Sequence, residues 1–253
     1  MKLLLIFLFI SPLFAEEITF SVLYENKSQP PYYLGNTEEV LEKPGLAVEM
    51  VQLLEKKLPQ IKVVLSRAPW KRCKKELELG KTDAIFNASF KKKRLKIGKY
   101  PWKNGKVDPS SRITTISYSL YKLKDNPISW NGKKFINLEG SIAAPLGYSI
   151  VGDLRKKNIE VNESRSTKTS FRMLQKNRVQ GVAAQTVTGD DLLKSNKFKS
   201  IIKNDPPLVT KDYFLMISHQ FYNKHPKLSE KIWKALAEIR QKQSKVLRKK
   251  YEN

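Results

Sequence analysis

The segment NASFKKKR at 87–94 holds polar side chains of the types that bind a carboxylate. Asn87 and Ser89 end a short apolar run, and Arg94 follows Ser89 by five residues. A carboxylate shielded from water needs a bidentate guanidinium and further N–H or hydroxyl donors. The residues alone equally fit a surface role for Arg94, as one more base in a run of four, and on that basis the surface role is favoured.

A second anion-binding segment is APLGYS at 144–149. Gly147, Tyr148 and Ser149 are predicted to end a strand and begin a helix, where backbone N–H groups are free to face an anion. An ordinary turn between a strand and a helix would have the same sequence, so both interpretations stay open.

Aromatic side chains gather near the ends of the first predicted strands. Tyr24, Tyr32, Tyr33 and Trp70 can stack on a flat or aliphatic part of a ligand, and Arg72 can add an anion contact. Packing in the core or at a rim accounts for each aromatic residue taken singly, and Arg72 can equally be solvated.

Catalytic chemistry is not indicated. The two histidines, His219 and His225, both follow the last predicted strand, and the chain has no Ser-His-Asp or Cys-His grouping, HExxH motif or phosphate-binding glycine loop. We therefore expect no catalytic residue, no metal site and no cofactor.

The elements that must position these side chains alternate between strand and helix. Strands are predicted at 18–24, 61–66 and 83–89, and helices at 45–59 and 69–80. Such β-α-β-α-β order predicts a parallel sheet.

The same alternation of strands and helices returns after a long strand-like segment at 113–124. Strands are predicted at 141–147, 159–164, 181–186, 200–205 and 212–218, with helices at 149–157, 167–177 and 189–196 and a last helix from about Leu228. This order predicts two α/β lobes, residues 16–118 plus 217–253 and residues 119–216. Two crossings, near 118–122 and 213–217, would form a hinge beside a cleft.

The N-terminal segment MKLLLIFLFISPLFA has the positive start, apolar run and small final residue of a cleaved signal peptide, residues 1–15. Cys73, the only cysteine, permits no intramolecular disulfide and lies too far from the cleavage site to carry a lipid. We therefore expect a free periplasmic protein rather than a lipoprotein.

Positive charge dominates the composition, with 48 Lys and Arg against 24 Asp and Glu and a net charge of +24, or +23 without Lys2. Such an excess suits anionic ligands, anionic surfaces or nucleic acid. Because the lysines are spread along amphipathic segments, a solvated basic surface is the favoured account. Nucleic acid is not expected as a partner of an exported protein.

Order and spacing of several motifs give a family resemblance. GLAVEM (45–50), GKTDAIF (80–86), NASFKKKR (87–94), IGKYP (97–101) and APLGYS (144–149) together resemble the extracellular solute-binding proteins of family 3, which serve polar amino acid ABC transporters. The resemblance covers nearly the whole mature chain. It implies the type II periplasmic-binding-protein fold, with two mainly parallel sheets flanked by helices and two hinge crossings.

The resemblance also implies roles for individual residues. Ser89 and Arg94 occupy the positions that hold a ligand's α-carboxylate, with Asn87 as a neighbouring contact, and the turn at 147–149 closes on the same group. Gln185 is a departure, because the family usually has an acidic residue there to pair the ligand's ammonium. Either another acid, Glu25 or Asp108, does this, or the ligand is not an ordinary α-amino acid.

The predicted function is capture of a small anionic or zwitterionic ligand by lobe closure and its delivery, by a monomer, to an inner-membrane ABC permease. Two alternatives stay open: a sensor of the same fold that signals to a membrane partner, and a basic surface that binds polyanions.

Overall fold

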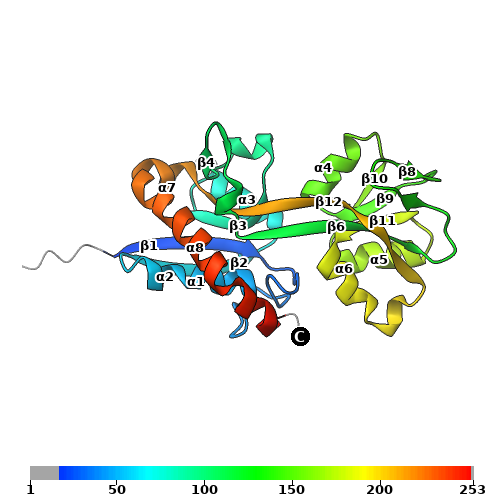
Figure 1. Ribbon diagram of the computed structural model, residues 1–253, viewed down its shortest axis with the longest axis horizontal. Helices are drawn as coiled ribbons and strands as arrows, with labels where there is room; N and C mark the ends of the chain where they lie inside the picture. Colours follow the sequence, from blue (N-terminus) through cyan, green and yellow to red (C-terminus); the bar gives the residue numbers. More distant parts are fainter. Residues whose placement is uncertain (1–16, 252–253) are drawn as a thin grey trace, which may run out of the picture.

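The computed structural model describes residues 17–251 (Figure 1). The predicted signal peptide, residues 1–15, lies outside these residues. The helices and strands form two groups, here called lobe 1 and lobe 2, and two long strands run from one to the other.

Lobe 1 contains the first elements of the chain and the last. Its strands are β1 (Ile18–Glu25), β2 (Ile61–Ala68), β3 (Ala84–Ser89), β4 (Trp102–Lys103) and β5 (Lys106–Val107). Its helices are α1 (Leu46–Gln52), α2 (Leu54–Lys57), α3 (Trp70–Glu78), η1 (Lys92–Lys96), η2 (Pro109–Ser111), α7 (His219–Lys224) and α8 (Pro226–Tyr251).

Lobe 2 contains the middle of the chain. Its strands are β7 (Ser129–Trp130), β8 (Phe135–Ile136), β9 (Ile142–Pro145), β10 (Val161–Ser164) and β11 (Gly181–Gln185), and its helices are α4 (Ser149–Arg155), α5 (Thr167–Gln175), α6 (Thr186–Leu193) and η3 (Asn196–Phe198). The connecting strands are β6 (Thr114–Leu123) and β12 (Ile201–Ile217).

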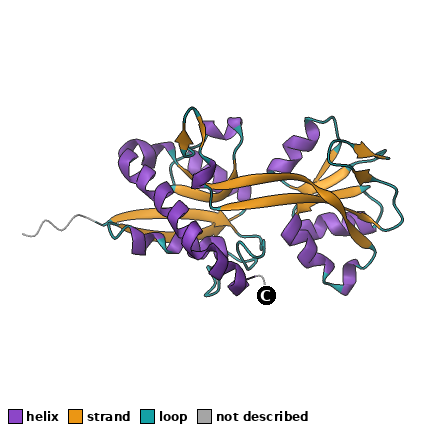
Figure 2. Ribbon diagram, viewed as in Figure 1, coloured by secondary structure: helices purple, strands orange, loops and turns teal. Residues whose placement is uncertain are grey.

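The main sheet has the order β10-β9-β11-β6-β12-β3-β1-β2 and serves both lobes. Within each lobe three strands are parallel, and β6 and β12 run antiparallel to their neighbours. Figure 2 shows helices on both faces of each end of this sheet, with only the two long strands between them. The carboxyl ends of β1, β3 and β11 therefore all point toward the junction of the lobes.

Burial patterns explain the elements closest to the junction. Every residue of β3 is buried, as expected for a central strand with helices on both faces of the sheet. In α3, Trp70, Cys73 and Leu77 share one buried face at helical spacing. The long α8 packs on α1, and Trp233 donates from Nε1 to the carbonyl of Leu215, 2.9 Å away. The last helix thereby joins the first lobe.

The predicted α/β two-lobed fold is confirmed in class and element order, with three local differences. The segment 45–59 is divided into α1 and α2 at Leu53. The segments 200–205 and 212–218 belong to one strand, β12, whose pairing with β6 shifts between Asn204 and Val209. Prolines 206 and 207 lie in that gap, where they have no N–H to donate.

The third difference concerns α6. It begins at Thr186, directly after Gln185, so Asp190 and Asp191 lie within the helix and not at its first turn. Asp190 accepts from Tyr121 Oη at 2.9 Å and from Lys203 Nζ at 2.7 Å. The Asp190 carboxylate therefore makes its contacts within lobe 2, away from the junction.

Candidate functional site

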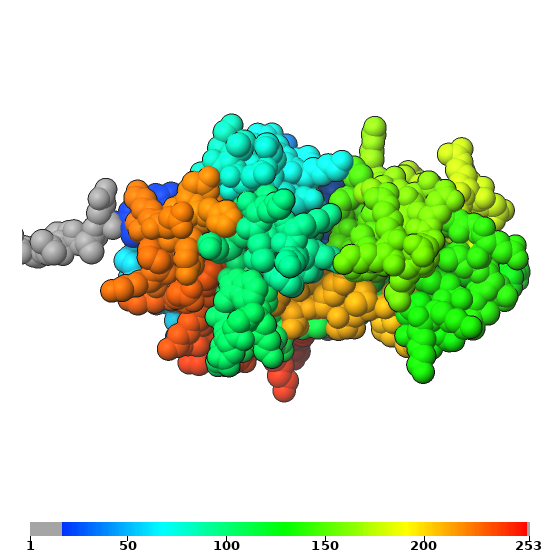
Figure 3. Space-filling view, turned by 90° about the horizontal axis from the view of Figure 1, so that it is seen from above, coloured from blue at the N-terminus to red at the C-terminus, as the bar shows by residue number. Residues whose placement is uncertain are grey.

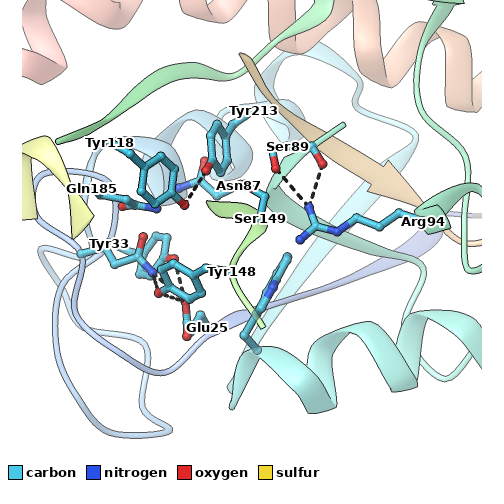
Figure 4. Close-up of a pocket in the computed structure, with 12 residues that line it drawn as sticks. Glu25, Tyr33, Asn87, Ser89, Arg94, Tyr118, Tyr148, Ser149, Gln185 and Tyr213 are labelled. Carbon is cyan, nitrogen blue, oxygen red and sulfur yellow. Dashed lines mark hydrogen bonds between the residues drawn. The ribbon is translucent and has the colours of Figure 1, made fainter. Parts of the chain in front are cut away.

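A small polar cavity lies between the lobes (Figure 4). Residues from both lobes and both connecting strands line it: Glu25, Gln29, Tyr33, Trp70, Asn87, Ser89, Arg94, Tyr118, Tyr148, Ser149, Gln185 and Tyr213. Its volume of about 20 Å³ is room for roughly one water molecule. An amino acid is several times larger, so its entry requires that the lobes separate or that Tyr148 moves.

Arg94 is fixed at one end of the cavity by the strand that precedes it. Its Nη1 donates to the carbonyl oxygen of Ser89 at 2.7 Å and to Ser89 Oγ at 3.3 Å. The guanidinium carbon lies 5.6 Å from the centre of the Trp70 ring, and the side chain is buried. Because a guanidinium carries five N–H donors, Arg94 keeps donors for a ligand beyond those that contact Ser89 and Tyr100.

Three buried amide side chains in the cavity have unpaired atoms. Asn87 Nδ2, Gln29 Oε1 and Gln185 Oε1 make no hydrogen bond within the described residues. Asn87 has a left-handed backbone, with φ of 54°, two residues before the end of β3. Since buried polar atoms are nearly always paired, this group indicates a site that binds a polar ligand.

Lobe 2 reaches across the junction through Tyr148. Its hydroxyl donates to Glu25 Oε2 of lobe 1 at 2.6 Å and also contacts Gln29 Nε2. Tyr33 Oη and Gln29 Nε2 donate to the same carboxylate oxygen, at 3.1 and 2.6 Å. Glu25 thus accepts a hydrogen bond that joins the lobes, beside the ion pair between Lys91 of lobe 1 and Asp153 of lobe 2.

The turn before α4 differs from its prediction in one respect. The N–H of Gly147 donates to Glu163 Oε2 at 2.8 Å, so it is not free to face an anion in the cavity. Gly147 lines a neighbouring groove instead. Ser149, the first residue of α4, does line the cavity, and its hydroxyl accepts from Lys211 Nζ at 2.9 Å.

The electrostatics of the cavity are asymmetric. Burial raises the pKa of Glu25 to about 7, against the opposing effect of its hydrogen bonds from Tyr148 and Tyr33. Lys74, just outside, has its pKa lowered to about 8 by burial and then by the charge of Arg94. One end of the site is therefore cationic, and the other carries a single acid that ionises near neutral pH.

The structure brings together most of the residues that the sequence indicated. Asn87, Ser89, Arg94, Trp70, Tyr148, Ser149 and Gln185 line the cavity. Tyr24 and Tyr32 do not: Tyr24 stacks on Phe86 in the core, with ring centres 5.1 Å apart, and Tyr32 is buried beside β6. Of the two acids considered, Glu25 is in the cavity, whereas Asp108 caps η2 at the surface.

Sequence reasoning missed three lining residues. Tyr118 and Tyr213 lie on the connecting strands, with their hydroxyls 2.8 Å apart, and Gln29 lies in the loop after β1. The predicted crossings near 118 and 213 were a usable signal, because polar side chains on hinge strands face the cleft.

Between 17 and 251 no three His, Cys, Asp or Glu side chains are grouped so that they can hold a metal ion. Over the same range no helix has the length and apolar character needed to cross a membrane.

Comparison with known proteins found likeness in structure only. No family model matches the chain, and no curated protein matches it. A histidine kinase sensor domain with similarity to periplasmic binding proteins has a TM-score of 0.74 at 14% identity, covering 93% of this chain and 96% of its own. The GluR0 ligand-binding core from Nostoc punctiforme, in complex with L-glutamate, has a TM-score of 0.69 at 14% identity, covering 92% and 98%.

A third neighbour is an ABC uptake transporter substrate-binding protein from Streptococcus pneumoniae with bound histidine, at a TM-score of 0.69 and 15% identity, covering 92% of each chain. At these identities the likeness establishes the fold. The chain therefore has the two-lobed fold of periplasmic binding proteins, over nearly its whole length.

Proposed function

We propose that this protein is a periplasmic solute-binding protein for a small zwitterionic carboxylate, which it captures by closure of its two lobes. The observation that carries the proposal is the opposition of Arg94 and Glu25 across one buried cavity between lobes. A guanidinium suits a carboxylate, and an ionised glutamate suits an ammonium group. Structural neighbours that hold glutamate or histidine support the ligand class.

Binding starts with the lobes apart. The ligand's carboxylate meets the free donors of Arg94 and the hydroxyl of Ser89, both on lobe 1. Its ammonium replaces Tyr148 as a donor to Glu25, and the unpaired oxygens of Gln29 and Gln185 accept further N–H groups. These contacts exist together only in the closed form, so the ligand shifts the population toward closure.

Delivery to an inner-membrane ABC permease, by a monomer freed from its signal peptide, is the downstream role that we propose. Sensing is a second candidate, because a histidine kinase sensor domain is among the structural neighbours. The two roles share the ligand site and differ in the membrane partner. Crosslinking of the liganded protein in intact cells, followed by identification of the captured membrane protein, separates them: a permease supports transport, and a kinase supports sensing.

The ligand site is tested by thermal unfolding of the purified protein with amino acids, small peptides and organic acids. A ligand at about 100 times its Kd stabilises by roughly 2.7 kcal/mol, which raises Tm by about 5–10 °C in a protein of this size. Arg94→Ala should abolish this rise. Arg72→Ala is the matched control, because Arg72 is exposed and paired with Glu76 outside the cavity.

The salt dependence of binding distinguishes a site in the cavity from a general basic surface. Binding in the buried cavity should persist at 0.5 M salt, whereas attraction to a polyanion falls steeply as salt is added. No stabilisation by any zwitterion, or stabilisation that Arg94→Ala leaves intact, would overturn the proposed function.

A further inference from the structure

A wide groove opens beside the cavity, between α3 and η1 of lobe 1 and α4 and β10 of lobe 2. Its volume is about 890 Å³, and it shares Arg94, Tyr148 and Ser149 with the cavity. Figure 3 shows the two lobes in contact on this side of the molecule. We call it the basic groove, after the basic side chains that line it: Lys71, Lys74 and Lys75, residues 91–94, Arg155 and Lys156.

Most of these basic side chains have no carboxylate partner among the described residues. The groove's two acids are already engaged, Glu78 with Lys75 at 3.0 Å and Glu163 with Arg155 at 3.1 Å. Lys91 pairs with Asp153. Within residues 17–251, Lys71, Lys74 and Lys93 form no ion pair, and all three line the groove together with Arg94.

The position of Lys74 shows that the fold itself holds these positive charges close together. Its ammonium lies 5.8 Å from the centre of the Trp70 ring, which lines the cavity. A Cβ at Gly147 would lie 3.4 Å from the same nitrogen, so lobe 2 closes directly over it. Burial and the neighbouring charges of Arg94, Lys93 and Lys71 lower the pKa of Lys74 to about 8. A bound anion would offset this repulsion.

We infer that the basic groove is a binding site for a second anionic group, a phosphate or a carboxylate, on a small molecule. The inference rests on the proposed function in that Arg94 holds the carboxylate head of the same molecule. A small molecule is favoured over a polyanionic surface because the groove is concave, lies between the lobes and is continuous with the cavity. Its volume is in the range of small-molecule sites, roughly 300–1,000 Å³.

The test uses three amino acids with the same zwitterionic head and side chains of increasing negative charge: L-glutamine, L-glutamate and O-phospho-L-serine. Isothermal titration calorimetry with the parent protein should show affinity rising by at least about tenfold at each step, since each added charge meets uncompensated lysines in a partly enclosed site. The glutamate and phosphoserine arms distinguish a carboxylate from a phosphate as the preferred group.

The groove variant is Lys71→Gln/Lys74→Gln/Lys93→Gln. It should still bind L-glutamine through Arg94 and lose the rise in affinity from glutamine to phosphoserine. The matched control, Lys227→Gln/Lys231→Gln/Lys245→Gln, removes the same charge from exposed positions on α8 and should keep the rise. A rise that survives in the groove variant, or one lost equally in both variants, would overturn the inference, because the effect would then not come from the groove.

Pyrophosphate, which has no zwitterionic head, separates this inference from the proposed function. If none of the three amino acids binds, but pyrophosphate binds to the parent and the α8 variant and not to the groove variant, the proposed function fails and the anion site stands. If the amino acids bind through Arg94 with equal affinities, the proposed function stands and the inference fails. If neither pyrophosphate nor phosphoserine binds, the groove is not an anion site.

Discussion

Replacement of Glu25 by glutamine should change how the stability of the protein depends on pH. Burial raises the pKa of this carboxyl group from 4.5 to about 7. Between these two pH values the folded protein keeps a proton that the unfolded chain releases, so its stability falls as the pH rises. The contribution of protonated Glu25 is therefore complete below pH 4.5 and is lost by pH 7.

The size of the effect follows from the two pKa values. Each pH unit between them is worth about 1.4 kcal/mol, so the loss across the window is about 3 kcal/mol. Glu25→Gln has no proton to release. The free energy of unfolding of the parent, relative to that of the variant, should thus fall by about 3 kcal/mol from pH 4.5 to pH 8. Contributions from other groups, such as Asp153 and Lys211, cancel in this difference.

Urea unfolding followed by tryptophan fluorescence at pH 4.5, 6 and 8 measures both proteins. Glu42→Gln, at an exposed position, is the control and should show no comparable trend. A parent–variant difference that stays constant from pH 4.5 to 8 would mean that folding does not change the proton affinity of Glu25, and it would refute the buried, lobe-bridging position assigned to this carboxyl group.

Two further predictions concern lobe closure and the core. Tyr148→Phe removes the hydroxyl that joins Glu25 and Gln29 across the lobes, at roughly 1–2 kcal/mol for such a hydrogen bond, and leaves the Lys91–Asp153 ion pair in place. The fraction of open molecules should rise, so X-ray scattering of the unliganded variant should give a larger radius of gyration than the parent or Tyr222→Phe. An unchanged radius would show that this bond does not hold the lobes together. Leu236→Ala, on the buried face of α8, should lower the free energy of unfolding in urea by about 2–5 kcal/mol. Val246→Ala, 63% exposed on the same helix, should change it by no more than about 0.5 kcal/mol. Equal effects of the two variants would contradict the packing of α8 on lobe 1.

Elements whose sequence pattern is local were predictable, and those that depend on distant partners were not. The apolar run AIFNAS and the spacing of Trp70, Cys73 and Leu77 fix β3 and α3 without reference to the rest of the chain. By contrast, β12 continues across two prolines because β6 pairs with both of its ends. That continuity depends on residues more than 70 positions away, and no local pattern contains it.

The same distinction applies to the site. Ser89, Arg94 and Ser149 lie in short motifs at the ends of predicted elements, where sequence order indicates a role. Tyr118 and Tyr213 reach the cavity only because the two connecting strands pair side by side, which brings their hydroxyls within 2.8 Å. Tyr24 and Tyr32 show the opposite error: as aromatic residues they were expected to line the ligand site, but both are buried in the core of lobe 1.

The positions of Glu25 and Gln185 suggest how closure works under the proposed function. Gln185, at the end of β11 in lobe 2, is neutral, whereas Arg94 and the ionisable Glu25 both belong to lobe 1. Lobe 1 alone can therefore balance both charges of a zwitterion before the lobes meet. Lobe 2 then adds neutral hydrogen bonds from Gln185 and Ser149, with Arg155 of α4 and the following Lys156 at the groove. Charge compensation thus selects the ligand in the open form, and the geometry of the hydrogen bonds, rather than a new ion pair in the cavity, drives closure.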